Sequence, residues 1–258
     1  MKDCGVIRLK KPDEIKILAE GGKILAAILD ELEASVKVGG TSQELEDLAR
    51  KLIAQHGVKS SFLGYAAKNH APFPAVTCVS VNEGVVHGVP NERVFEEGDL
   101  VGIDCGIVYK GMYLDSARTV GVGNISVESQ KLMDVTRRAM FAGIEQAKSG
   151  NRIGDISAAI EGVIRPHGYG IVTQLVGHGV GYDVHEDPRV PNFGEAGKGE
   201  KIKEGLVIAI EPMVTLGGGD VATAKDGWTI ETQDKSPAAH FEQTVAVTSA
   251  GPRILTSR

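Results

Sequence analysis

The chain has 258 residues, a net charge of −6 at pH 7, 42% hydrophobic residues and 24% charged residues, which is typical of a globular protein. The negative net charge gives no support to a strongly basic nucleic-acid-binding protein. The first residues contain no apolar core of a signal peptide, and no run approaches the roughly 18 apolar residues of a membrane span, so neither is expected.

Four helices are predicted from the spacing of apolar residues. Residues 13–32 form the first, and Pro12 suits its start because a missing N–H costs nothing in the first turn. The second covers residues 41–57 and ends at a glycine, which is a natural C-terminal stop. The third and fourth are predicted over residues 126–148 and 153–167.

Strands are predicted both between and after these helices. The β-rich runs are residues 75–81, 100–108 and 112–120, and a turn at Tyr109-Lys110-Gly111 joins the last two. From Ile171 onward, short apolar runs alternate with glycine-rich turns, which indicates further β structure.

Two parts of the chain resemble each other. VGGTSQELEDLARKLIAQHG at 38–57 matches SGNRIGDISAAIEGVIRPHG at 149–168 at a constant offset. Further on, EEGDLVGID parallels KEGLVIAIE with one residue of slack, which sets Asp104 opposite Glu211. Chance similarity between two amphipathic helices is the alternative. A true repeat predicts two related halves, each helix–helix–sheet, with a carboxylate on an inner strand of each.

The segment GIDCGIVYKGMYLDSA holds two aspartates on neighbouring predicted strands. Side chains alternate along a strand, so Asp104 shares a face with Gly102 and Gly106, which predicts open space above it. A hairpin would bring Asp115 back beside Asp104. Two close carboxylates repel each other unless a cation lies between them. An exposed strand acid is the competing interpretation of Asp104.

Three further candidates come from the second half of the chain. His178 lies between two glycines in GHGVGYDVH, which lets a ligand approach closely. Glu211 ends the apolar run LVIAIE, where an unpaired charge is costly to bury, and Pro212 restricts its backbone to extended geometry. Glu242 lies in the strand pattern HFEQTVAV. Taken singly, His178 suits a core or turn position and Glu242 a solvent-facing strand position.

Together these residues form a set of hard oxygen donors with one imidazole. Four carboxylates and a neutral imidazole carry a charge of −4, which two divalent cations would cancel. We therefore interpret the set as a two-metal hydrolytic site. The sequence contains no phosphate-binding loop, serine nucleophile elbow or dinucleotide fingerprint. The set is Asp104, Asp115, His178, Glu211 and Glu242.

With these segments in order, the sequence closely resembles type I methionine aminopeptidases of peptidase family M24, over nearly all of its length. The resemblance rests on SFLGY, CVSVNEGVVHGVP, GDLVGIDCGIVYKGMYLDSART, GHGVGYDVHEDP, AIEPM and DGWTIETQDKSPAAHFEQTVAVT. It implies an α+β pita-bread fold, in which two pseudo-symmetric halves share a central curved, mostly antiparallel sheet covered by helices. It also implies a single catalytic domain over residues 1–258, with a short extension at residues 1–12, as in the short bacterial form.

The resemblance implies two divalent metal ions per chain, and Co, Mn, Fe or Zn would all suit the donors. Asp115 and Glu242 match the carboxylates that bridge the two ions. Asp104 matches a ligand of one ion. His178 and Glu211 match the ligands of the other.

Three residues match catalytic positions of the family. Glu211 is expected to take a proton from the attacking water and return one to the leaving amine. His185 matches the histidine that hydrogen-bonds the peptide carbonyl or its oxyanion, and His87 matches the one near the scissile amide. The implied reaction is metal-dependent removal of the N-terminal methionine from nascent proteins and peptides, with preference for a small second residue.

The resemblance also implies a pocket for the methionine side chain. Aromatic groups and a thiol suit a thioether through polarizable contacts. The predicted lining consists of Phe62, Tyr65, Phe73, Cys78 and Trp228, and His87 and His185 are also expected to contact the substrate.

Two features depart from the family pattern. The segment AAKNHAPFPAVT at 66–77 is longer than usual, which leaves the role of Phe73 and the shape of the pocket entrance open. Val184 stands where some members carry an aromatic residue, so a slightly roomier pocket is expected.

The three cysteines, Cys4, Cys78 and Cys105, are odd in number and widely spaced, which argues against a disulfide framework and suits a reducing cytoplasm. From the resemblance we expect a monomer that acts on the N-terminal methionine of peptides and nascent chains and associates with the ribosome. Neither a membrane nor a specific nucleic acid is expected as a partner.

Two other functions stay open from the sequence. X-Pro aminopeptidases and prolidases share the fold but usually carry an additional N-terminal domain, for which there is no room before residue 60. Non-catalytic ribosome- or RNA-associated relatives usually lack several ligands, whereas all five are present here. Stoichiometric metal after purification would separate an enzyme from such a binding protein.

Overall fold

The computed structural model describes residues 6–66 and 71–258. The helices are α1 (Pro12–Ser35), α2 (Ser42–Gln55), α3 (Val127–Gln146) and α4 (Ile153–Ile164), which continues into a 3₁₀ turn at Arg165–His167. The strands of the first half are β1 (Lys59–Ser60), β2 (Thr77–Val81), β3 (Gly84–Val86), β4 (Leu100–Tyr109) and β5 (Met112–Gly121). Those of the second half are β6 (Gly170–Ile171), β7 (Gly177–Gly179), β8 (Glu186–Val190), β9 (Val207–Ile210), β10 (Met213–Thr215), β11 (Val221–Thr223), β12 (Ile230–Thr232), β13 (Ala238–His240), β14 (Glu242–Thr248) and β15 (Gly251–Ile254).

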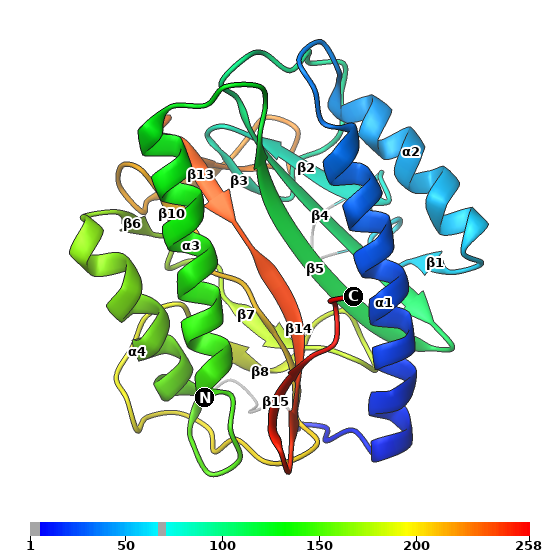
Figure 1. Ribbon diagram of the computed structural model, residues 1–258, viewed down its shortest axis with the longest axis vertical. Coiled ribbons are helices and arrows are strands. Elements are labelled where there is room, and N and C mark those ends of the chain that lie inside the picture. The colour runs from blue at the N-terminus through cyan, green and yellow to red at the C-terminus, as the bar shows by residue number, and fades with distance from the viewer. Residues whose placement is uncertain (1–5, 67–70) are drawn as a thin grey trace.

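Within the described residues, the main sheet has nine strands, and every pairing in it is antiparallel. Its order is β1-β4-β5-β14-β9-β7-β8, with β2 also on β4 and β15 also on β14. Two three-stranded sheets, β13-β10-β6 and β11-β12-β3, adjoin it. In Figure 1, α1 and α2 lie on one side of the long β14 ribbon, and α3 and α4 lie on the other.

The helices begin where their backbone N–H groups find side-chain acceptors. At α2, the Thr41 hydroxyl accepts from the Glu44 N–H at 3.1 Å, and the Glu44 carboxylate accepts from the Thr41 N–H at 3.3 Å. This reciprocal capping box satisfies two N–H groups that the helix itself leaves unpaired. At α3 the cap is one-sided: the Ser126 hydroxyl accepts from the Ser129 N–H at 3.0 Å.

The turn between β4 and β5 fixes the register of the hairpin that carries both aspartates. Lys110 and Gly111 have φ angles of 48° and 81°, so both central residues of the two-residue turn are left-handed. This is the backbone of a type I′ turn, whose twist matches that of paired strands. It pairs Tyr109 with Met112 and sets every later pair along the hairpin.

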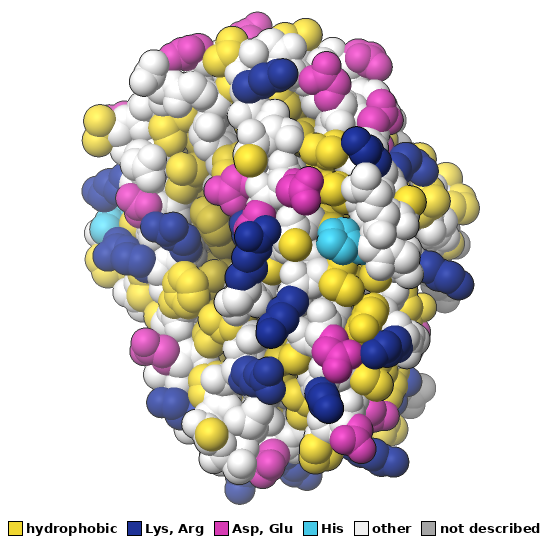
Figure 2. Space-filling model, turned by 45° about the vertical axis from the view of Figure 1, so that its right-hand side comes forward, with side chains coloured by type: hydrophobic (Ala, Val, Ile, Leu, Met, Phe, Trp, Pro, Cys, Tyr) yellow, Lys and Arg dark blue, Asp and Glu magenta, His cyan; other side chains and the backbone are white. Residues whose placement is uncertain are grey.

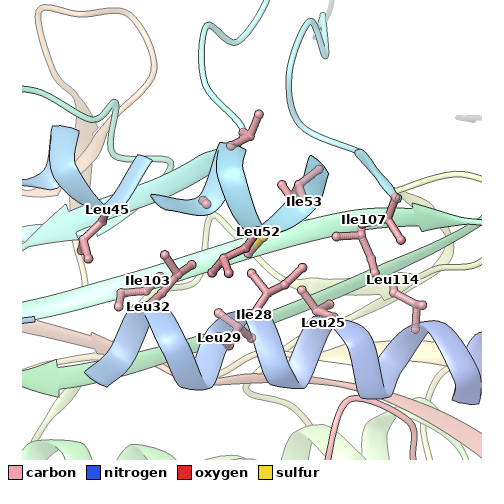
Figure 3. Packing of buried hydrophobic residues seen from close by; sticks show 14 of the residues in the cluster. Leu25, Ile28, Leu29, Leu32, Leu45, Leu52, Ile53, Ile103, Ile107 and Leu114 are labelled. Atoms are coloured by element: carbon pink, nitrogen blue, oxygen red, sulfur yellow. The ribbon is translucent and has the colours of Figure 1, made fainter. Parts of the chain in front are cut away.

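The apolar residues form two main cores, one under each helix pair. The first core packs α1 and α2 against β4 and β5, and Figure 3 shows leucine and isoleucine side chains from both helices meeting the sheet. The second core packs α3 and α4 against β9, β10 and β14. The residues labelled in Figure 3 are Leu25, Ile28, Leu29, Leu32, Leu45, Leu52, Ile53, Ile103, Ile107 and Leu114.

The two cores confirm the predicted division into related halves. In the sheet, β4 and β5 of the first half mirror β9 and β14 of the second, with β5 next to β14 at the centre. Asp104 lies within β4, and Glu211 directly follows β9, as the internal repeat predicts. The predicted mixture of helices with a mostly antiparallel sheet is also confirmed.

Most predicted elements are confirmed, with shifts at their ends. The strand predicted over residues 75–81 begins only at Thr77, where its pairing with β4 starts opposite Cys105; the Val76 N–H before it donates to the Glu46 carboxylate. The last turn of the fourth predicted helix is a 3₁₀ turn that contains Pro166. The short strands β1 and β3 were not predicted, since two or three residues carry too little alternation to be recognised.

Figure 2 shows Lys and Arg side chains mixed with Asp and Glu side chains over one face of the molecule. Within residues 6–66 and 71–258, no helix combines the length and the apolar character needed to cross a membrane. Cys78 and Cys105 are buried free thiols, whereas Cys4 lies outside the described residues.

Glu46 joins α2 to the start of β2 inside the first half. Its carboxylate is 3% exposed and accepts from the backbone N–H groups of Val76 at 2.9 Å and Thr77 at 3.0 Å. The Thr77 hydroxyl donates to it at 2.8 Å, and Arg50 lies 2.7 Å away as an ion-pair partner.

We expect Glu46→Ala to lower the free energy of unfolding by about 3 kcal/mol, because it leaves several buried donors without an acceptor. Urea unfolding monitored by circular dichroism measures the change. Asp47→Ala, one residue further along the same helix and exposed, is the matched control and should cost less than about 0.5 kcal/mol. Equal stabilities of the two variants would contradict the role given to Glu46.

Candidate active site

The register of the main sheet brings the candidate donors to one face in two adjacent rows. In the first row, Asp104 on β4 pairs with Ala117 on β5, which pairs with Glu242 on β14. The next pair, Gln243 with Ile210, shows that Glu242 faces Glu211 just beyond the end of β9. Three carboxylates therefore line up across four neighbouring strands.

The second row lies two residues away on the same face, since side chains repeat every second residue. Asp115 on β5 pairs with Gly106, and its backbone exchanges two hydrogen bonds with the Thr244 hydroxyl at 3.2 and 2.7 Å. Thr244 pairs with Ala209, and Ala209 pairs with His178 on β7. The imidazole and the fourth carboxylate thus join the first row.

Distances between side-chain atoms show that the two rows meet. Potential ligand atoms of Asp115, His178 and Glu242 all lie within 4.8 Å of one another. His178 Nε2 lies 3.3 Å from a Glu211 oxygen. All five predicted donors line a single cavity of about 630 Å³.

Burial raises the pKa of each carboxyl group in this cluster. The pKa of Asp115 is raised to about 7 by burial. Burial also raises the pKa values of Asp104, Glu211 and Glu242 well above the usual range, and the negative charge of Asp115 raises all three further. Four carboxylates this close repel one another, so the cluster is more stable when it binds protons or cations.

His178 presents a lone pair to the cluster. Its Nδ1 lies 2.9 Å from the Gly179 carbonyl oxygen, so this nitrogen carries the proton and donates it. Burial lowers the pKa of His178 to about 3, which leaves Nε2 unprotonated. That nitrogen faces the Glu211 carboxyl group at 3.3 Å, so the pair needs either a proton on Glu211 or a cation between the two groups.

Unpartnered oxygen atoms support the same conclusion. One oxygen each of Asp104, Asp115 and Glu242 is buried without a hydrogen-bond partner among the described residues. Buried polar atoms are nearly always paired, so three unpartnered carboxylate oxygens in one cluster fit the ligand set of a cation. The donors also match what divalent metals prefer, and the histidine ligand geometry, with its second nitrogen on a backbone carbonyl, is common in metal sites.

An apolar chamber opens directly beside the donors. Phe73 and Trp228 meet edge to face with ring centroids 5.3 Å apart. Phe62 and Cys78 pack in the same buried cluster, with Tyr65 against it. All five predicted pocket residues and Val184 line the cavity that holds the donors. Residues 67–70 of the long 66–77 segment lie outside the described residues, whereas Phe73 is buried in the wall.

The sequence predicts open space beside Asp104, and this prediction is wrong at Gly106. A Cβ at Gly106 would lie 2.1 Å from the Ser61 hydroxyl and 2.6 Å from the Phe62 ring. The glycine therefore lets the pocket wall approach the sheet, rather than leaving room above it. A Cβ at Gly102 would lie 3.6 Å from the nearest atom, which is an ordinary van der Waals contact.

His87 and His185 both line the cavity on its polar side. His87 adopts a left-handed backbone with φ of 57°, which is strained for a residue with a side chain and often marks a functional position. Burial lowers its pKa to about 4 and also lowers the pKa of His185, so both rings are neutral near pH 7. The His185 ring meets that of His178 edge to face at 4.5 Å, and its Nδ1 lies 3.0 Å from the Tyr65 hydroxyl.

His240 belongs to this region but was not predicted from the sequence. Its side chain is buried, and Nε2 lies 3.6 Å from the second Glu211 oxygen. Burial lowers its pKa to about 3. Residues two apart on one strand share a face, so the position of His240 two residues before Glu242 was a signal for this site. The break between β13 and β14 makes that spacing hard to recognise in the sequence.

The sequence pattern of metallopeptidase family M24 matches residues 16–249 of the chain. The chain therefore belongs to this family, and the pita-bread fold predicted for it is confirmed by solved structures. A methionine aminopeptidase from Clostridium perfringens is 46% identical over 251 residues, which cover 97% of this chain and 99% of the relative.

Solved structures give the same result. The crystal structure of methionine aminopeptidase from Thermotoga maritima matches with a TM-score of 0.94 and 41% identity, covering 98% of this chain and 100% of that one. Prolidase from Pyrococcus furiosus matches with a TM-score of 0.76 and 25% identity, and it covers 97% of this chain but only 65% of the prolidase. The similarity to methionine aminopeptidases is thus higher and extends over both whole chains.

The buried acids predict an unusual pH dependence for the metal-free protein. A free histidine has a pKa of about 6.5, so above about pH 7.5 the histidines are largely neutral in both the folded and the unfolded state, and the carboxyl groups dominate. Their raised pKa values mean that the folded state holds more protons than the unfolded state, whose acids titrate near pH 4. The free energy of unfolding therefore falls as pH rises from about 7.5 to 9, by up to about 1.4 kcal/mol per pH unit for each proton.

Calorimetry with a chelator, and again with excess Mn²⁺, checks this prediction. Metal binds the ionised carboxylates, so its addition should release protons, raise the melting temperature and flatten the pH dependence. A metal-free stability that stays constant or increases over this pH range would contradict the predicted protonation.

Proposed function

We propose that the chain is a metal-dependent aminopeptidase that removes the N-terminal methionine from peptides and nascent proteins, with preference for a small second residue. One observation carries the proposal. Five donor side chains meet at the polar end of an apolar, aromatic-lined cavity, in a chain similar over its whole length to methionine aminopeptidases.

Two divalent cations fit the donor set by charge, since the four carboxylates carry four negative charges when ionised. Asp115 and Glu242, at the centre of the two rows, would bridge the ions. Asp104 on one side and His178 with Glu211 on the other would complete the two coordination spheres. Co²⁺, Mn²⁺, Fe²⁺ and Zn²⁺ are all compatible with oxygen donors and one imidazole.

Bound divalent ions supply Lewis acidity, which lowers the pKa of water and polarises a carbonyl group. Glu211 would accept the proton of the attacking water and return one to the leaving amine. Its carboxylate lies near two neutral imidazoles, His178 at 3.3 Å and His240 at 3.6 Å, so neither of these side chains adds a positive charge that would lower its basicity.

His185 and His87 act on the substrate side of the cavity. As neutral rings they donate a hydrogen bond to the carbonyl oxygen that becomes negative in the transition state. The Tyr65 hydroxyl holds His185 Nδ1 at 3.0 Å, which fixes the orientation of the ring. Donors that are already oriented need no rearrangement when the charge develops.

The apolar chamber accounts for the choice of methionine. Phe62, Phe73 and Trp228 offer polarizable surface, and burial raises the pKa of Cys78, which keeps its thiol neutral. An unbranched thioether gains contact energy there, whereas a charged side chain would lose its hydration.

We also propose that residues 1–258 work as one catalytic unit and as a cytoplasmic monomer that acts on nascent chains at the ribosome. Both hydrophobic cores pack on strands of the same sheet, which supports one unit. Buried free thiols suit a reducing compartment. Analytical ultracentrifugation tests the monomeric state, and co-sedimentation with ribosomes tests the association with the ribosome.

The X-Pro aminopeptidase alternative is not favoured, because the prolidase match leaves about a third of that chain uncovered. A non-catalytic role is not favoured either, because all five donors are retained around the cavity. Hydrolysis of a peptide panel that varies the first residue, with each metal in turn, distinguishes these functions.

Glu211→Gln preserves the size of the side chain but removes its basicity. We expect kcat for methionine release from Met-Gly-x peptides with Co²⁺ or Mn²⁺ to fall by about 10²- to 10⁴-fold. Metal content by mass spectrometry separates loss of the base from loss of a ligand. Glu204→Gln, an exposed change seven residues earlier, is the control. Near-normal turnover with metal bound would remove Glu211 from proton transfer.

His185→Ala should lower kcat by about 10²- to 10³-fold, the usual effect of removing one oxyanion donor. Steady-state kinetics on the same peptides measure it, with exposed His56→Ala as the matched control. An unchanged kcat in His185→Ala would exclude the oxyanion role.

A further inference from the structure

A buried ion pair outside the donor cluster joins the N-terminal segment to the loop that carries His185. Lys10 lies just before α1, and Glu186 begins β8. Their side chains are only 1% and 2% exposed, and Lys10 Nζ lies 2.9 Å from Glu186 Oε2. The two residues are 176 positions apart, so the contact exists only in the folded chain.

The Glu186 carboxylate folds back onto its own loop. Its second oxygen, Oε1, accepts hydrogen bonds from the backbone N–H groups of Tyr182 at 2.5 Å and Asp183 at 3.1 Å. These contacts close a five-residue turn from Tyr182 to Glu186. His185 lies inside that turn, so its backbone position depends on the carboxylate.

Lys10 is itself held from both ends. Its backbone N–H donates to the Gly205 carbonyl at 2.7 Å, and its ammonium donates to the Arg8 carbonyl at 3.2 Å. The stem packs so closely on Gly181 that a Cβ there would lie 2.4 Å from Lys10 Cε. The lysine thus fills the space behind the turn as well as neutralising Glu186.

The arrangement suits positioning better than stability. Burial lowers the pKa of Lys10 even though Glu186 opposes that shift, so the protein bears a desolvation cost for the charge. Buried ion pairs add little net stability over apolar residues of similar volume. Arg8 also approaches Glu186 at 3.4 Å, but its side chain is 44% exposed and is therefore the weaker partner.

We propose that Lys10 is a positioning residue for His185. By neutralising Glu186 inside the protein, Lys10 keeps the carboxylate on the Tyr182 and Asp183 amides, and the fixed turn aims the His185 ring into the cavity. The catalytic consequence rests on the role proposed above for His185, whereas the structural part does not.

Hydrogen exchange of the metal-free protein tests the structural part. Lys10→Met retains the unbranched stem of the side chain but lacks the ammonium group, and we expect the Tyr182 and Asp183 amides to exchange at least about tenfold faster. The neighbouring Lys11→Met is the matched control, because Lys11 is exposed, and should leave both amides unchanged. Wild-type exchange in Lys10→Met would overturn the proposal.

Kinetics test the consequence for the reaction. Lys10→Met should lower kcat and kcat/KM by the same factor, between about 10- and 100-fold. The reason is that a displaced His185 ring no longer donates its hydrogen bond in the transition state. In a His185→Ala background the same substitution should have no further effect, since the group that it positions is gone. An equal loss in both backgrounds would indicate a general structural effect and overturn the proposal.

A second variant covers the case in which Lys10→Met fails to fold with an unpaired Glu186. The double change Lys10→Met/Glu186→Gln removes both charges, and it should still accelerate exchange at Tyr182 and Asp183, because a neutral amide is a weaker acceptor than a carboxylate. Wild-type exchange in this variant contradicts the proposal.

The outcomes also separate this proposal from the proposed function. If the wild-type protein releases no methionine with any metal, the aminopeptidase assignment fails while the exchange data still decide the role of Lys10. If the wild type is active and Lys10→Met matches it in turnover and exchange, only the positioning role fails.

Discussion

The cross-strand register of β4, β5, β14, β9 and β7 determines which side chains can act together in this protein. Side chains alternate between the two faces of a sheet, so a slip of one residue in any pair would turn a donor into the apolar core. The type I′ turn at Lys110 and Gly111 sets this register for the two aspartates. The exchange of hydrogen bonds between Asp115 and Thr244 then joins the two halves at the centre.

The same arrangement concentrates an electrostatic cost. Four buried carboxyl groups with raised pKa values destabilise the folded chain wherever they ionise without a cation. Two hydrophobic cores, one under each helix pair, offset that cost and hold the strands in place. Cation binding and fold stability are therefore coupled, and the catalytic cluster is a strained part of an otherwise well-packed structure.

The substrate side of the site is assembled from segments far apart in the chain. Phe62 approaches the sheet only because Gly106 has no side chain, and Trp228 reaches Phe73 from a loop in the second half. The turn with His185 depends on Lys10 from the N-terminal segment. Each contact spans dozens of residues, so the pocket and the oriented imidazole depend on the whole fold rather than on one motif.

The sequence by itself determined the local elements and the chemistry of the donors. Helical spacing, the capping box at Thr41 and the alternation around Asp104 and Asp115 depend on neighbouring residues, and the internal repeat indicated two halves. Only the tertiary structure decided that the space at Gly106 is filled, that β2 starts at Thr77, and that His240 and Lys10 adjoin the site. The reason is physical: local periodicity is written in consecutive residues, whereas strand register, loop paths and side-chain neighbours result from packing across the whole chain.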